Sequence, residues 1–187
     1  MNALLTTLWH HIALLIRENI LIPLIFGVAV ISIVAVYRKK SRHDLTKKQG
    51  IFTFLFSFFW LFPFQITLIS RIGKGTVEPL KDIFGGWIIT RSKYAFELGC
   101  IENVLMFMPF GILFCMLLIS KGCNAKRTLF DVTAVSFLMT AFIETTQLLT
   151  KLGTFQISDL VYNTLGGLIG AGLYIIINRK IKQKKAT

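Results

Sequence analysis

Long apolar runs separated by short polar or basic segments dominate the sequence. A helix needs about 20 mostly apolar residues to cross the roughly 30 Å of hydrocarbon in a bilayer. The runs that approach or reach this length cover residues 20–36, 51–70, 99–120, 128–150 and 159–178. The pattern therefore predicts an all-α integral membrane protein, a helical bundle with about five transmembrane helices.

Two further segments do not fit a simple span. Residues 1–16 are apolar, but the first basic residue is Arg17, so the charged opening of a cleavable signal peptide is missing. We expect this segment to be retained, either as an interfacial helix or as an extension of the first span. Residues 71–97 contain glycine and proline breaks and should form an external loop, either a functional lid or a poorly ordered connection.

Composition supports a membrane protein. Hydrophobic residues make up 54% of the 187 residues, and the mean hydropathy is +0.66. Both values exceed what the core of a soluble domain of this size needs. With no internal repeat or low-complexity linker, we expect residues 1–187 to form a single membrane domain in a multi-pass protein of the cell membrane, with residues 1–70 as its N-terminal helices.

The charges predict the topology of this bundle. There are 21 Lys and Arg against 9 Asp and Glu, and the basic residues gather in runs between the apolar segments. They form no stripe with interleaved aromatics, which argues against nucleic acid as a partner. Basic runs collect in cytoplasmic loops, and the strongest lie at residues 38–48, 121–127 and 179–185. The predicted N-terminus is therefore outside and the C-terminus cytoplasmic.

Cysteine and histidine usage suggests neither disulfides nor metal. Cys100, Cys115 and Cys123 fall at one end, the interior and the other end of a single predicted span, so they cannot pair with one another. The histidines lie outside the acidic stretch, and no CxxC motif is present. We expect no metal site and no cofactor.

Polar residues in the last three spans are the candidate site. A charged side chain near the bilayer centre costs about 2.5 to 3.5 kcal/mol even on the lenient insertion scale, so each acid needs a reason to be there. With the predicted topology, these residues all fall in the outer half of the membrane. Glu144 and Gln147 are three residues apart, and Asp159 and Asn163 are four apart, so each pair lies along one side of its helix. The predicted polar binding cluster comprises Glu102, Asn103, Glu144, Gln147, Asp159 and Asn163.

The acids differ in how easily a plain structural role explains them. Asp159 stands at a helix start, where a carboxylate ordinarily caps free backbone N–H groups. Glu102 lies at an interface, where a solvated acid is cheap. Glu144 lies inside an apolar helix and must be protonated, paired or facing water, so we expect it to matter most.

Small residues predict close helix packing. The last span contains Gly166-x-x-x-Gly170, a spacing that lets another backbone approach closely, and the simplest partner is the preceding span at 128–150. We assign packing roles to Pro109, Gly111, Gly166, Gly167 and Gly170.

Three motifs resemble those of the VanZ-like membrane proteins. They are IENVLMFMPFGILF (residues 101–114), FIETTQ (142–147) and SDLVYNTLGGLIG (158–170), and the resemblance covers roughly residues 77–174. The sequence departs from the family pattern at Gln156, where many members carry an acid, and at Gly153 and Thr154, where many carry an arginine. It also has Pro79-Leu80 in place of a common Pro-Phe pair.

This resemblance implies a protein of the bacterial cell envelope that lowers susceptibility to teicoplanin-type glycopeptide antibiotics. The implied mechanism is an outward-facing polar intramembrane site that binds the drug or a lipid-linked cell-wall precursor, with membrane lipids as further partners. One alternative is an intramembrane enzyme acting on a lipid headgroup with Glu144 and Asp159 as acid and base. No activated nucleophile is evident, which favours a non-enzymatic role. A small carrier or accessory subunit is a third possibility.

Overall fold

The computed structural model describes residues 2–40, 46–87, 90–91 and 96–184, and most of them are helical. The helices are α1 (Asn2–Asn19), α2 (Leu21–Lys40), α3 (Lys47–Thr67), α4 (Gly99–Ser120), α5 (Ala125–Thr150) and α6 (Ile157–Lys184). A short 3-10 helix, η1 (Ile69–Arg71), follows α3, and β1 (Thr90–Arg91) pairs antiparallel with β2 (Phe96–Glu97). The helices α2 to α6 are long and apolar enough to cross a membrane, which confirms the predicted helical bundle with five spans.

Most of the helices extend beyond the apolar runs because polar residues continue or cap them. Thr46 and Gln49 form a capping box at the start of α3, in which each side chain bonds the other residue's backbone N–H. The side chain of Asn124 likewise accepts a hydrogen bond from the backbone N of Arg127 at the start of α5. α2, α5 and α6 are therefore several residues longer than the apolar pattern predicts, whereas α4 has the predicted bounds.

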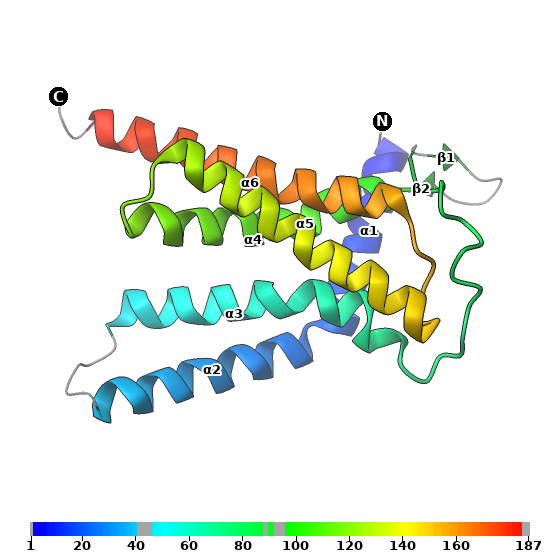
Figure 1. Ribbon diagram of the computed structural model, residues 1–187, viewed down its shortest axis with the longest axis horizontal. Helices are drawn as coiled ribbons and strands as arrows, with labels where there is room; N and C mark the ends of the chain where they lie inside the picture. The colour runs from blue at the N-terminus through cyan, green and yellow to red at the C-terminus, as the bar shows by residue number, and fades with distance from the viewer. Residues whose placement is uncertain (1, 41–45, 88–89, 92–95, 185–187) are drawn as a thin grey trace.

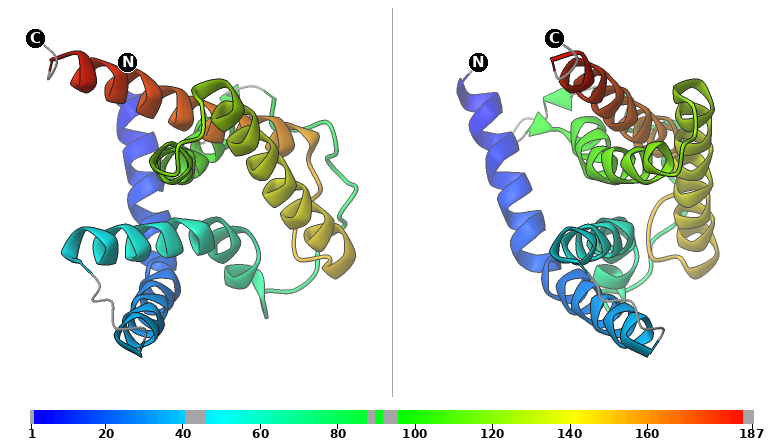
Figure 2. Two further views of the ribbon diagram at one scale, coloured as in Figure 1. Left: turned by 60° about the vertical axis from the view of Figure 1, so that its left-hand side comes forward. Right: turned by 90° about the vertical axis from the view of Figure 1, so that its left-hand side faces the viewer.

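The N-terminal segment forms a separate helix. α1 ends at Asn19 and α2 begins at Leu21, with Pro23 in its first turn. A proline has no N–H to bond the carbonyl four residues earlier, so one continuous helix is disfavoured here. Figures 1 and 2 show α1 crosswise to the other helices. Of the two alternatives, this arrangement fits the interfacial helix.

The ends of the spans separate into two groups. The end of α2, the start of α3, the α4–α5 connection and the C-terminal end of α6 lie at one end of the bundle, as Figure 1 shows. The end of α3, residues 69–87, the start of α4 and the turn between α5 and α6 lie at the other. The grouping matches the alternation that the charge pattern predicts, and the assignment of the second end to the outside stays a prediction.

The core consists of two buried clusters among the last three helices. One comprises Phe107, Phe110, Met139 and Ile143, and the other comprises Cys115, Val132, Ala171 and Ile175. Aromatic rings extend the first cluster to α3, where Trp60 meets Phe110 edge-on with ring centroids 5.4 Å apart. The last three helices thus form a packed unit against which α3 lies.

Glycines bring α6 close to α4. A Cβ at Gly166 would meet the carbonyl oxygen of Val104, and one at Gly170 would meet that of Met108. The expectation that this pair packs against the preceding span was therefore wrong, because its partner is α4. Gly167 lies about 100° further round the helix and faces α5, where a Cβ would meet the Ser136 hydroxyl.

Candidate functional site

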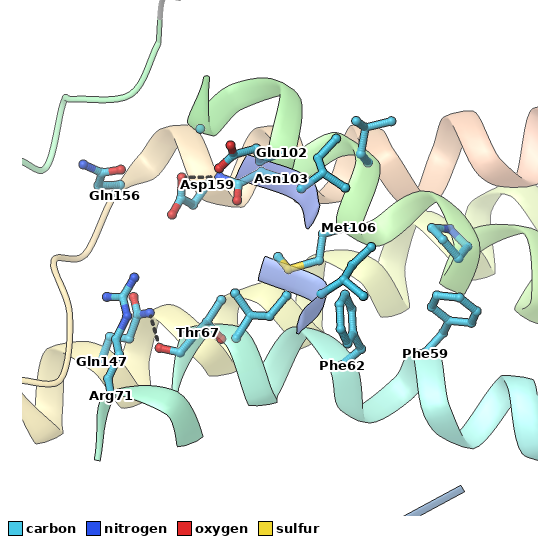
Figure 3. Close-up of a pocket in the computed structure, with 16 residues that line it drawn as sticks. Phe59, Phe62, Thr67, Arg71, Glu102, Asn103, Met106, Gln147, Gln156 and Asp159 are labelled. Atoms are coloured by element: carbon cyan, nitrogen blue, oxygen red, sulfur yellow. Dashed lines mark hydrogen bonds between the residues drawn. The ribbon is translucent and has the colours of Figure 1, made fainter. Parts of the chain in front are cut away.

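A cavity of about 520 Å³ lies where α1, α3 and α4 meet the start of α6. We call two sets of lining residues its polar side and its apolar side. The polar side comprises Arg71, Glu102, Asn103, Gln147, Gln156 and Asp159. The apolar side comprises Ile12, Ile16, Phe59, Phe62, Ile66, Leu105, Met106 and Pro109. Figure 3 shows the labelled polar residues gathered at one end of the cavity, with Phe59 and Phe62 at the other.

Asp159 and Asn103 connect two helices at this cavity. The side-chain amide of Asn103, the fifth residue of α4, donates to the Asp159 carboxylate in the first turn of α6, at 2.7 Å (Figure 3). Asp159 is the third residue of its helix, and its carboxylate accepts from a side chain of α4. The Asp159 carboxylate thereby ties α6 to α4, while the N-terminus of α6 favours its negative charge.

Glu144 lies behind the cavity wall. Its side chain is 1% exposed, and its carboxylate accepts a hydrogen bond from the backbone N of Gln156 at 2.9 Å. Gln156 belongs to the turn between α5 and α6 and itself lines the cavity. Glu144 is thus paired with the backbone and holds the turn that presents Gln156.

Gln147, one turn further along α5, does line the cavity. It is 3% exposed, and its amide donates to the backbone carbonyl of Thr67 at 3.0 Å. This bond joins the end of α5 to the end of α3 (Figure 3). Gln147 therefore closes the polar side of the cavity between two spans.

Asn163 lies deeper, between α6 and α5. It is 2% exposed, and its amide donates to the Thr140 hydroxyl at 2.9 Å. The cavity therefore collects Glu102, Asn103, Gln147 and Asp159 from the predicted cluster, whereas Glu144 and Asn163 lie outside its lining. Pro109, expected only to pack, also lines it.

Arg71 is a cavity residue that the sequence reasoning missed. It comes from η1, and its guanidinium lies against Gly153 in the α5–α6 turn, where a Cβ would meet its Nη1 atom. Nη1 also approaches the carbonyl of Leu152 at 3.5 Å. The one sequence signal was the missing side chain at Gly153, which leaves space for a group from elsewhere.

The segment at residues 77–87 holds the turn in place. The backbone N of Phe155 donates to Pro79 at 2.8 Å, and that of Ile157 donates to Ile83 at 3.1 Å. The Ser158 hydroxyl donates to the carbonyl of Gly85 at 2.7 Å. This part of the predicted external loop is therefore hydrogen-bonded to the start of α6.

Across the ranges that the structure describes, no three His, Cys, Asp or Glu side chains gather so that they could hold a metal ion. Cys100, Cys115 and Cys123 are free thiols. The chemistry of the cavity therefore rests on its carboxylates, amides and guanidinium.

Comparison with known proteins places most of the chain in one family. A family model described as VanZ/LLP1 matches residues 21–178. Protein VanZ of Enterococcus faecium is 33% identical over 85 residues, which is 46% of this chain and 49% of that protein. The match thus spans about half the length of that relative. No solved structure matches the chain.

Proposed function

The chain belongs to the VanZ/LLP1 family, and from this membership we propose that it acts in the bacterial cell membrane to lower susceptibility to teicoplanin-type glycopeptide antibiotics. The observation that carries the proposal is the cavity, which sets charged and amide groups beside apolar side chains at the end predicted to be outside. Such a combination suits an amphiphile drawn from the outer leaflet. The relevant ligand is the drug or a lipid-linked cell-wall precursor.

The size of the cavity limits how much of either ligand can enter. Ligand pockets typically measure about 300 to 1,000 Å³ and enclose most of a drug-sized molecule. The volume of about 520 Å³ lies within this range. A whole lipoglycopeptide is much larger than a drug-sized molecule, so only its lipid-bearing portion would enter. For a lipid-linked precursor, the entering portion would be part of the head and the adjoining chain.

The placement of the carboxylates supports binding over catalysis. An acid or base must come within hydrogen-bond reach of the proton that it transfers. Asp159 lines the cavity, but Glu144 lies behind its wall and is bonded to a backbone N–H. A reaction that uses Glu144 and Asp159 as its acid and base would require Glu144 to leave this position.

The proposal is tested by the teicoplanin inhibitory concentration of a susceptible host that expresses the protein. We expect the wild type to raise this concentration and Asp159→Asn to abolish the increase. Asp131→Asn makes the same change on α5, far from the cavity, and should retain the increase. Membrane levels of each variant are compared by immunoblot. Full protection by Asp159→Asn, or none by the wild type, would refute the proposal.

A further inference from the structure

Of the charged residues that line the cavity, Arg71 and Asp159 carry opposite charges and do not meet. Arg71 and Asp159 both line it, and Figure 3 shows them on opposite sides of its polar end. Within the described part of the chain, neither takes part in an ion pair; the pair found there joins Arg127 to Asp131 at the other end of α5. The space between Arg71 and Asp159 is therefore bounded by a cation on one side and an anion on the other.

The position of Arg71 is set by its surroundings, and its hydrogen-bonding capacity is largely unused. A guanidinium carries five N–H donors in a planar fork. The bond found for it in the described part of the chain is the 3.5 Å contact with Leu152, at the long limit for a hydrogen bond. Gly153 leaves room for the guanidinium beside the turn. Arg71 is thus held at the cavity with donors left for another group.

The Asp159 carboxylate also has unused hydrogen-bond acceptor positions. Its Oδ1 atom accepts from Asn103, but a carboxylate has about four acceptor positions. Its half-buried carboxylate lies at the cavity, and a charge removed from water is costly unless it is paired. The same holds for the half-buried Arg71. An occupant with one charge would satisfy one of these residues and leave the other unpaired.

We propose that the ligand is an amphiphile whose head carries a phosphate and, a few atoms away, a primary ammonium. The phosphate binds Arg71, whose fork suits two parallel hydrogen bonds to phosphate oxygens. The ammonium donates to Asp159, and an acyl or prenyl chain lies against the apolar side, along Phe62 and Met106. This inference rests on the proposed function in one respect, that the cavity is a ligand site.

A binding measurement on the purified full-length protein in detergent tests this inference. The probes are phosphatidylethanolamine and phosphatidylglycerol with the same fluorescent acyl chain, which share the phosphate and differ in the ammonium. We expect the wild type to bind phosphatidylethanolamine about tenfold more tightly, the factor that corresponds to one charge-assisted contact. A polyprenyl phosphate, which lacks the ammonium, should displace it about tenfold less well than unlabelled phosphatidylethanolamine does.

Variants test which residue binds the ammonium and which binds the phosphate of the lipid head. Asp159→Asn should remove the preference between the lipids, whereas Arg71→Gln should weaken binding of both. Gly153→Ala keeps the arginine, but the added methyl would meet Nη1 of Arg71 and crowd the Gln147 amide. It should therefore also weaken binding of both lipids, and it replaces Arg71→Gln in the test if that variant folds poorly. The matched changes Asp131→Asn and Arg127→Gln, at the far end of α5, should leave affinity and preference unchanged.

Equal wild-type affinity for the two lipids would overturn the inference, as would an unchanged preference in Asp159→Asn. Equal displacement by polyprenyl phosphate would also overturn it, by indicating a site that recognises phosphate alone. The result is separable from that of the antibiotic assay. A strong preference without teicoplanin protection refutes the proposed function only, whereas protection without a preference refutes the ligand assignment only.

Discussion

Replacing Gly170 by alanine should separate α6 from α4. The added methyl would meet the carbonyl oxygen of Met108, and the backbone N of Ile112 lies 3.1 Å from the same point. Both atoms belong to the backbone of α4, so neither can rotate aside as a side chain could. Inserting a methylene into a packed interface costs about 1 to 3 kcal/mol. We expect a loss of stability of this size.

Gly172 provides a matched control on the same helix. A Cβ there has no neighbouring atom within 4 Å, so alanine adds no clash. Alanine is also favoured over glycine inside a helix by about 0.8 to 1 kcal/mol. Gly172→Ala should therefore be neutral or stabilising. Because the propensity gain applies at both positions of α6, the two variants should differ by the cost of the clash alone, about 1 to 3 kcal/mol.

Unfolding in mixed micelles with increasing sodium dodecyl sulfate, followed by circular dichroism, measures this difference. Cys115 adds a local reporter, because its buried thiol lies at the α4–α6 contact and donates to the carbonyl of Ala171 at 3.6 Å. Its alkylation should be faster in Gly170→Ala than in Gly172→Ala. Equal stability of the two variants would refute the idea that this contact depends on the absence of a side chain.

Two further predictions concern the turn and the topology. Glu144→Ala removes the acceptor for the buried backbone N–H of Gln156 and should cost about 1 to 3 kcal/mol in the same unfolding assay, whereas Glu144→Gln keeps an acceptor oxygen and should cost less. Equal losses would show that this hydrogen bond contributes little. In intact cells, a membrane-impermeant maleimide should label Cys100 but not Cys123, because the charge pattern predicts that the two ends of α4 lie on opposite sides of the membrane. Labelling of Cys123 alone would reverse the predicted topology.

The number and type of helices could be predicted from the sequence because apolar run length reports directly on span length. The ends of the helices were harder to predict. Thr46 and Asn124 begin helices outside the apolar runs, since their side chains satisfy backbone N–H groups that hydrophobicity does not register. Pro23 marked the break before α2. Whether α1 was an interfacial helix or an extension of the first span depended on tertiary packing, which the sequence pattern does not show.

The candidate site was only partly predictable, because helical spacing shows which residues share a face but not which helix that face meets. The depth of each residue in its span put Asp159 and Asn103 in one cluster, and the structure joins them by a hydrogen bond. Helical spacing did not separate Gln147, which lines the cavity, from Glu144, which lies one turn away behind the wall. The role of Arg71 could not be predicted, because Leu152, the residue that its guanidinium approaches, lies 81 residues away along the chain.

The position of α1 gives the cavity a part that lies outside the family match. Every residue of the polar side falls within residues 21–178, the segment that the family shares. Part of the apolar side, Ile12 and Ile16, comes from the helix that precedes this segment. Under the proposed ligand assignment, a relative that keeps the shared segment but carries a different leading helix would bind the same head while accepting a chain of different length or shape. The proposal therefore implies that exchange of one peripheral helix would change selectivity for the ligand's chain and leave the charged residues that bind its head unchanged.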